Sequence, residues 1–247
     1  MVTSRSNQPQ SPPEIVYPES DGKPMADNTV QFRWISVIYH NLAWLFAENP
    51  NVFIAGDLLW YPVEGNNQLS QAPDVMVAFD RPKGDRGSYK QWQENDIAPQ
   101  VVFEILSPTN TLKEMGRKFL FYNDYGVEEY YIYDPQKNDL SGWLRGEAEV
   151  PEMARLEIIE KMEGWVSPRL EIRFEMNAET MELYRPDGSP FLDYNTVQQR
   201  LQQAEQRAET AEQRAETAEQ RAETAEQRAH QLAARLRELG IDPDALD

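Results

Sequence analysis

The sequence predicts an α/β domain followed by one long C-terminal helix. The α/β prediction depends on a strand, helix and strand in direct succession between Pro99 and Asp134, flanked by short apolar segments and turns. The long helix is predicted by a seven-residue repeat that begins shortly after Asn195. The chain of 247 residues is long enough for one substantial domain and such an appendage.

The central unit is read from its apolar runs and its breakers. Gln100–Leu106 is a short apolar run typical of a buried strand, and Ser107-Pro108 ends it. Thr109 and Asn110 offer a cap for a helix that runs to about Tyr125, where Gly126 follows. Glu129–Tyr133 is a second apolar run. We therefore expect a crossover that places both strands in one sheet.

The first strand contains one acid, Glu104, which is costly to bury unless a cation or several donors meet it. On the following helix, Lys118 lies about 70° from the centre of the apolar stripe, whereas Lys113 and Arg117 are expected to point away. The alternative is an ordinary surface pair between Lys118 and Glu114, four residues earlier. The stripe itself consists of Leu112, Met115, Phe119 and Tyr122.

The N-terminal part is predicted to be an arm and a helix. Residues 1–28 are polar and proline-rich, typical of a mostly flexible arm that ends in a docked segment. Asn28 and Gln31 resemble a capping box, so a long helix should follow. His40, beside the apolar face of this helix, is expected to be a packed side chain rather than a ligand. That face comprises Phe32, Ile35, Ile38, Tyr39, Leu42 and Leu45.

Three strands are expected before the central unit. Asn51–Ile54 and Asp57–Tyr61 are predicted as two strands joined by a short turn, and Val75–Phe79 as a buried strand. Asp74 stands at the entrance of the last of these, either as a site residue or as a simple strand-start aspartate. The polar loop Arg81–Asp96 is the basic segment expected near the site, where it would contact a phosphate backbone or simply be solvated.

Beyond Pro135, apolar segments alternate with turns. We predict three or four antiparallel strands with Trp143 and Trp165 packed between them. The α/β domain is assigned to residues 29–194, the repeat helix to 195–240 and a short tail to 241–247.

The repeat is AEQRAET, which occurs three times between residues 204 and 224. It keeps a heptad seam, so we prefer a coiled coil to a single solvent-exposed helix. A parallel dimer is expected, because it places Arg207 opposite Glu212 and Arg214 opposite Glu219 of the other chain. Within one helix these arginines have no glutamate three or four residues away.

Composition excludes several classes of protein. The chain has no cysteine, which rules out disulfides, thiolate metal sites and cysteine nucleophiles. It has no long apolar run and no secretory signal, so a cytoplasmic protein without a membrane span is expected. Of the net charge of −18, −14 falls before Thr196. This acidity disfavours broad attraction to nucleic acid but leaves room for a locally basic cleft.

Asp74, Glu104 and Lys118 together suit one chemistry. Two carboxylates at neighbouring strand ends can hold a hard divalent cation, with carbonyls and water completing its shell. A nearby lysine can orient or deprotonate water, or neutralise the charge that develops on a phosphorane. The set therefore predicts phosphodiester hydrolysis.

Four motifs in this order resemble a known family: A-P-D-V, F-E-I-L-S-P-T-N, K-F-L-F-Y and G-V-E-E-Y-Y-I-Y-D-P. They are similar to the Uma-type putative restriction endonucleases of the PD-(D/E)xK superfamily, over about Tyr17 to Arg173. The resemblance implies a restriction-endonuclease-like fold with a central mixed sheet flanked by helices. It also implies an endonuclease that uses Mg²⁺ (or Mn²⁺) and acts on nucleic acid, with DNA the expected substrate.

Carried over onto this sequence, the resemblance makes Asp74 and Glu104 the catalytic, metal-binding acids. The superfamily lysine usually lies two residues after the second acid, where this chain has Leu106. The matching lysine is then Lys118 on the next helix, and Glu19 is a candidate for an early family acid. Two alternatives remain open: a catalytically silent nuclease fold that serves as a coiled-coil assembly or scaffold module, and a domain that binds a small phosphorylated ligand.

Overall fold

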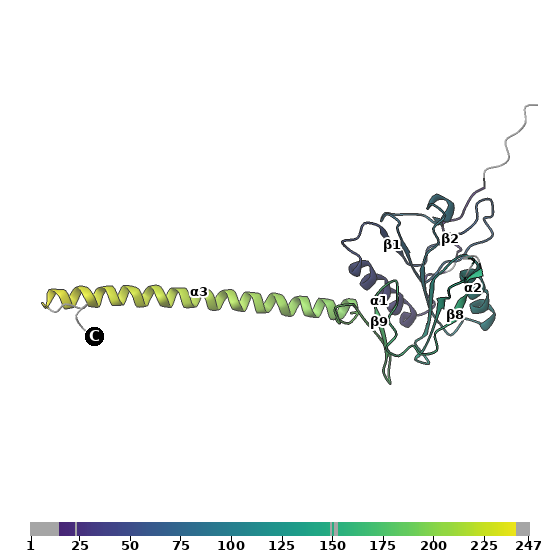
Figure 1. Cartoon of the computed structure of the whole chain (residues 1–247). Helices are drawn as coiled ribbons and strands as arrows, with labels where there is room; N and C mark the ends of the chain where they lie inside the picture. The colour runs from purple at the N-terminus through teal and green to yellow at the C-terminus, as the bar shows by residue number, and fades with distance from the viewer. Residues whose placement is uncertain (1–14, 23, 149, 151–152, 241–247) are drawn as a thin grey trace, which may run out of the picture. The chain divides into compact units, whose positions relative to one another are not determined.

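The computed structural model describes residues 15–22, 24–148, 150 and 153–240. The chain divides into two compact units, Met1–Asp193 and Tyr194–Asp247 (Figure 1). Most of the expected flexible arm, and the expected tail 241–247, lie outside the described residues. The described end of the arm is docked: the Tyr17 ring lies 5.2 Å from that of Tyr61, and the Tyr61 hydroxyl donates to the Pro18 carbonyl at 2.8 Å.

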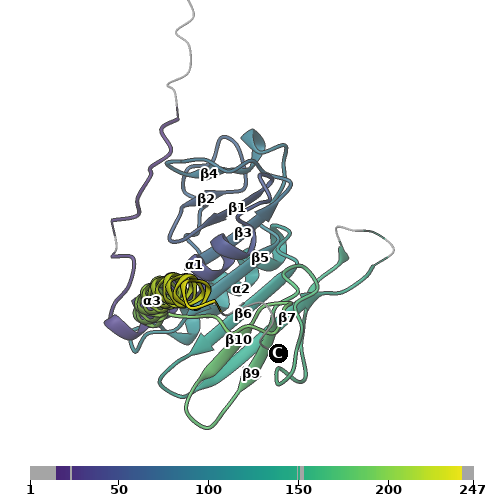
Figure 2. The same cartoon turned by 90° about the vertical axis from the view of Figure 1, so that its left-hand side faces the viewer.

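The first unit is built on a six-stranded sheet in the order β1-β3-β5-β6-β7-β8 (Figure 2). Its strands are β1 (Val52–Ala55), β3 (Val75–Phe79), β5 (Val101–Ile105), β6 (Glu129–Asp134), β7 (Asp139–Arg145) and β8 (Leu156–Ile158). β5 and β6 are parallel, and all other neighbours are antiparallel. The predicted α/β class with a central mixed sheet is therefore confirmed.

The helix α2 (Leu112–Asp124) connects the two parallel strands, as the sequence predicts. Its cap is Thr111, whose hydroxyl accepts from the Glu114 amide at 3.2 Å, so the helix begins slightly later than expected. Gly126 follows the helix at a φ of 94°, a backbone conformation that favours glycine.

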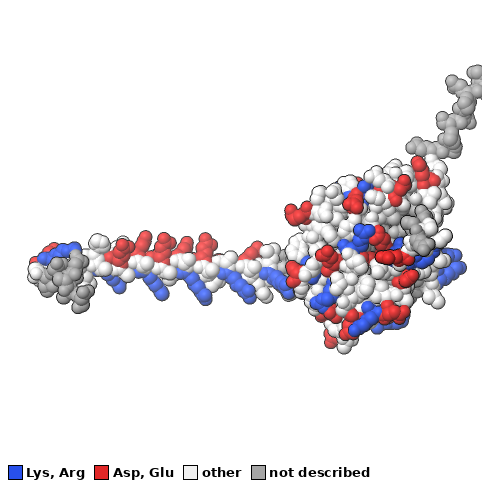
Figure 3. All heavy atoms as spheres, viewed as in Figure 1, with Lys and Arg blue, Asp and Glu red and all other residues white. Residues whose placement is uncertain are grey.

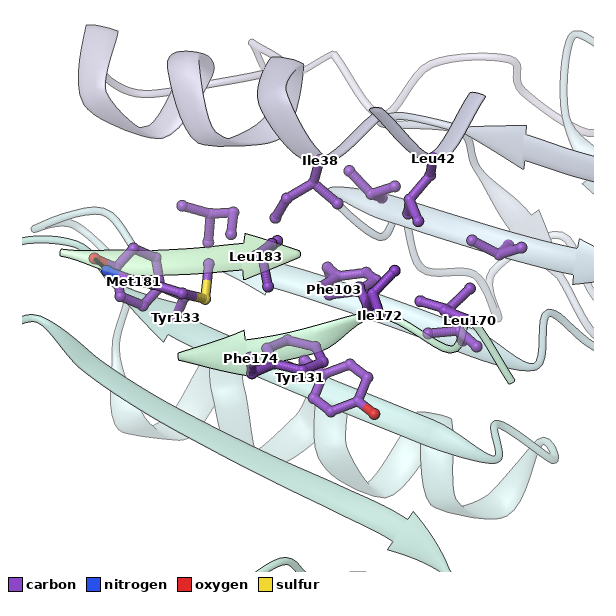
Figure 4. Packing of buried hydrophobic residues seen from close by; sticks show 14 of the residues in the cluster. Ile38, Leu42, Phe103, Tyr131, Tyr133, Leu170, Ile172, Phe174, Met181 and Leu183 are labelled. Atoms are coloured by element: carbon purple, nitrogen blue, oxygen red, sulfur yellow. Dashed lines mark hydrogen bonds between the residues drawn. The ribbon is translucent and has the colours of Figure 1, made fainter. Parts of the chain in front are cut away.

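Helices cover both faces of the sheet. α1 (Thr29–Leu45) packs on one face together with the hairpin β9 (Arg173–Met176) and β10 (Met181–Tyr184). Figure 4 shows Ile38 and Leu42 of α1 pointing towards Phe103 of β5 and the hairpin residue Leu183. α2 packs on the opposite face, where Phe121 and Tyr122 join a second core with Val102 of β5.

The strand predicted at Asp57–Tyr61 is shorter than expected and lies outside the central sheet. β1 pairs with β3, whereas β2 (Trp60–Tyr61) lies in a separate small sheet, parallel to β4 (Tyr89–Lys90) and followed by the 3-10 turn η1 (Gln91–Gln93). Asp57 is not in a strand: its φ is 49°, and its amide donates to the Pro73 carbonyl at 3.1 Å. This local turn directs the chain out of the central sheet after β1.

The predicted antiparallel strands after Pro135 form, but they belong to two sheets. β7 and β8 extend the central sheet, whereas β9 and β10 form a separate two-stranded sheet. The expected position of the tryptophans between these strands is wrong. Trp143 stacks on Tyr130 on the α2 face, and the Trp165 indole donates to the Tyr131 hydroxyl on the other. Tyr130 and Tyr131 are consecutive in β6 and face opposite sides of the sheet, so the two tryptophans lie on opposite faces.

The second unit contains α3 (Tyr194–Glu238), a helix of 45 residues with no buried side chain. Figure 3 shows its Lys/Arg and Asp/Glu side chains gathered along different sides of the helix. Thr210, Thr217 and Thr224 each donate to the carbonyl four residues earlier. No helix within the described residues is long and apolar enough to cross a membrane.

Candidate active site

The two predicted acids face each other across neighbouring strands. β3 and β5 are antiparallel with Val75 opposite Phe103, so the next pair in this register is Asp74 and Glu104. Asp74 is 8% exposed and Glu104 2%. The Ile105 amide donates to Asp74 Oδ2 at 2.6 Å, which fixes this carboxylate against the end of β5.

Both oxygens of Glu104 are held by α2. Lys118 Nζ lies 2.6 Å from Glu104 Oε2, and the Tyr122 hydroxyl donates to Oε1 at 2.5 Å. Lys118 and Tyr122 are four residues apart and therefore project from one side of the helix. The buried Glu104 therefore has Lys118 as its cation, as the sequence predicts. The Tyr122 hydroxyl is a second, neutral donor that the sequence did not predict for the site.

The predicted orientation of α2 is only partly correct. Lys118 pairs with Glu104 and not with Glu114, so the surface-pair alternative does not hold in this structure. Lys113 and Arg117 were expected to point away, but both line the same cleft as Lys118. The expected apolar stripe also differs from the buried face: Phe121, Tyr122 and Asn123 are buried, whereas the stripe residue Leu112 is 91% exposed. Lys113 and Arg117 line the cleft while remaining exposed.

The three predicted residues line one cleft of about 570 Å³. Its remaining lining comes from the segment before and including α1, from the chain on either side of β2, and from the start of α2. Acidic side chains of the cleft include Asp21, Asp27, Asp57 and Glu114, and the cations among its described lining residues come from α2.

Burial and like charges shape the electrostatics of this cleft. Burial, followed by the Glu104 charge, raises the pKa of Asp74 to about 8. Burial and the nearby Asp21 raise the pKa of Asp57 above its usual value. Burial disfavours the charged form of Lys118, but the attraction of the Glu104 and Asp74 carboxylates is stronger in sum. The pKa of Lys118 is therefore raised. The two acids therefore resist carrying two negative charges without an added cation.

Gln31 of α1 supports the site in a way that the sequence analysis missed. Its side chain is 6% exposed; Nε2 donates to the Ile105 carbonyl at 2.8 Å and Oε1 accepts from the Asp27 amide at 2.8 Å. The Asn28 side chain caps α1 as predicted, but Gln31 does not return to the Asn28 amide as a capping box would require. Gln31 instead joins the first turn of α1 to the end of β5.

Other predicted features lie elsewhere. The Glu19 carboxylate lies against Gly87 and is not among the described residues that line the cleft. The basic loop Arg81–Asp96 was expected near the site, but its Arg86 pairs with Glu94 and stacks on Phe53, beside a second groove. The exposed His40 packs edge-on against Tyr39.

The donor set of the cleft fits a hard cation. Asp74 and Glu104 offer carboxylate oxygens, the ligand type that Mg²⁺ and Mn²⁺ prefer. Within the described ranges, no group of three or more His, Cys, Asp or Glu side chains is arranged to hold a metal ion. The protein would therefore supply two carboxylates, with the rest of the coordination shell left to water and substrate.

Comparison with known proteins identifies the family of the chain. The family model Uma2, described as "Putative restriction endonuclease", matches residues 22–179. No curated protein matches the chain. A crystal structure of a putative nuclease belonging to DUF820, from Anabaena variabilis ATCC 29413, has 13% sequence identity and a TM-score of 0.41, covering 57% of this chain and 72% of that one. Because the family match spans more than half of the chain, the protein belongs to the Uma2 family of putative restriction endonucleases.

Proposed function

We propose that this chain is a divalent-metal-dependent endonuclease that hydrolyses phosphodiester bonds in DNA. The observation that carries the proposal is the buried pair Asp74 and Glu104 at neighbouring strand ends, open to a cleft and joined there by Lys118. Membership of a putative restriction endonuclease family supports the reaction class.

Asp74 and Glu104 are the residues that would hold Mg²⁺ or Mn²⁺. Such an ion, when bound, polarises the scissile phosphate and lowers the pKa of a bound water. The raised pKa of Asp74 favours this assignment, because a cation would stabilise the ionised form that burial and Glu104 oppose.

The remaining roles belong to side chains of α2 and to the backbone. Lys118 is charged at neutral pH and supplies a positive group for the negative charge that develops on the phosphate during hydrolysis. Tyr122 holds the second oxygen of Glu104 and limits its rotation. The Ile105 amide positions Asp74 in the same way.

The test is cleavage of supercoiled plasmid by purified protein with Mg²⁺ or Mn²⁺. Glu104→Gln should lower the rate by roughly two orders of magnitude or more, because it removes the charge of a metal ligand. Glu114→Gln is the matched control: Glu114 lines the same cleft without an ion pair to Lys118. Equal rates in the wild type and Glu104→Gln would reject this site.

We also propose that α3 forms a parallel coiled-coil dimer. Arg207, Arg214, Arg221 and Arg228 make no ion pair within the described part of α3, and a parallel partner would bring glutamates opposite them. Alanine at both seam positions buries little area, so the association should be weak. Sedimentation of the full chain beside a chain ending at Asp193 tests this, and monomers of both at tens of micromolar would reject it.

A second candidate is a catalytically silent scaffold. It is favoured by the length of α3, by the absence of buried residues from this helix and by the net charge of −18. It predicts that the wild type, tested on DNA and RNA with either metal, self-associates but cleaves nothing.

A further inference from the structure

Almost every cation of the first unit has a partner. Within residues 15–22, 24–148, 150 and 153–193, the lysines and arginines form ion pairs, donate to backbone carbonyls or lie over aromatic rings, with three exceptions. The exceptions are Arg33, Lys113 and Arg117, all of them exposed. Arg33 lies on α1 and does not line the candidate cleft, whereas Lys113 and Arg117 both do.

The positions of Lys113 and Arg117 on α2 are electrostatically unfavourable for the helix itself. They are four residues apart on α2, where like charges repel by a few tenths of a kcal/mol, although Glu114, three residues before Arg117, offsets part of this repulsion. Lys113 also lies in the first turn, at the positive end of the helix dipole, where a cation is unfavourable. A bound anion would relieve both penalties.

The cleft is electrostatically asymmetric. Among the described residues its cations Lys113, Arg117 and Lys118 come from α2, which also contributes the acid Glu114. Three further acids, Asp21, Asp27 and Asp57, lie in other segments of the lining. A polyanion in this cleft is therefore attracted towards α2 and repelled from the other side. The overall acidity of the protein makes such a local basic surface the main source of phosphate attraction.

We propose that Lys113 and Arg117 bind phosphates of one DNA strand and hold that strand along α2, with the scissile phosphate beside Lys118 and Glu104. The inference rests on the proposed nuclease function and names the side chains that bind its substrate. Side chains four residues apart on a helix lie on one face, with Cβ atoms roughly 5–6 Å apart, which lets both contact the same strand.

Binding of a fluorescent single-stranded oligonucleotide and of its duplex, measured by anisotropy over a series of salt concentrations, tests the proposal. Lys113→Gln and Arg117→Gln should each weaken binding by roughly 3–10-fold, uniformly across sequences. The slope of log K against log salt should fall by about 0.7 for single strands, or about 0.9 for duplex, per lost contact. Arg33→Gln is the matched control and should bind as the wild type does.

Kinetics separates substrate binding from chemistry. If the wild type cleaves DNA, the variant that combines Lys113→Gln and Arg117→Gln should have a KM about tenfold higher or more and a nearly unchanged kcat. The reason is that the lost contacts stabilise the bound substrate and the transition state equally. Unchanged melting temperatures of all variants would show that the fold is intact.

The outcomes separate the two proposals. A double variant that binds DNA as tightly as Arg33→Gln, with the same salt slope, overturns the role of Lys113 and Arg117 even if the protein cleaves DNA. A wild type that binds no DNA overturns it as well. Binding that depends on both residues, without cleavage under any metal condition, upholds the strand contact and rejects the nuclease activity.

Discussion

Replacing Asp74 by asparagine should stabilise the protein in the absence of metal. Asp74 is buried beside Glu104, and these surroundings raise its pKa from 3.8 to about 8. Asparagine cannot ionise, yet its side-chain oxygen can still accept the Ile105 amide that Asp74 binds at 2.6 Å. The substitution therefore removes the cost of a buried charge and keeps the hydrogen bond.

The magnitude follows from the difference in pKa between the folded and unfolded states. A carboxyl group whose folded pKa is raised contributes its full stability below pH 4, and this contribution is lost as the pH rises towards 8. At pH 7 the unfolded state is about three pH units above its pKa, and each unit is worth about 1.4 kcal/mol. The upper limit is then about 4 kcal/mol, and roughly 2–4 kcal/mol is expected if local opening lets water reach the carboxylate.

The assay is urea unfolding between pH 4 and pH 9 without divalent metal, followed by the fluorescence of the six tryptophans. The free energy of unfolding of Asp74→Asn minus that of the wild type should be near zero at pH 4 and should grow up to pH 8. Asp139→Asn, at an exposed aspartate that begins β7, is the control and should show no such growth.

Metal should narrow the difference in stability between the two proteins. A cation at 100 times its Kd stabilises the folded wild type by about 2.7 kcal/mol, whereas the variant, having lost one ligand charge, should gain less. The reasoning is refuted if metal-free Asp74→Asn is less stable than the wild type at pH 7–8, or if the difference between them does not change with pH.

Three further changes test the surroundings of the site and the tail. Tyr122→Phe removes one donor from Glu104, so urea unfolding at neutral pH should show a loss of about 1–3 kcal/mol; an unchanged midpoint would mean that the hydrogen bond contributes nothing. Gln31→Leu leaves the Ile105 carbonyl without its partner and should cost a similar amount, about 1–3 kcal/mol, in the same assay, whereas full stability would contradict the bridging role. Ala215→Cys, in a chain with no other cysteine, should form a crosslinked dimer under mild oxidation if α3 pairs in parallel register; failure to crosslink in a chain that still dimerises would reject that register.

Local patterns in the sequence were sufficient for the central unit and for the acids of the site. The runs around Glu104 and Glu129 and the breakers between them predict two strands joined by a helix, because each signal acts within a few residues of the chain. Because a buried Glu104 is costly without a partner, the sequence also predicted a cation beside it. The periodicity of α2 indicated Lys118, whose Nζ lies 2.6 Å from Glu104 Oε2 in the structure. The heptad pattern likewise predicted one helix over residues 195–240, close to the observed α3 at Tyr194–Glu238.

The tertiary structure decided which elements and side chains meet. The sequence joined β2 to β1, but the turn at Asp57 sends β2 to pair with β4. Lys113 and Arg117 line the cleft although both are exposed, which the apolar stripe of α2 did not predict. Gln31 reaches Ile105 across 74 residues of sequence. Periodicity describes the faces of an element but not its partner, and the partner depends on how the whole chain buries its apolar surface.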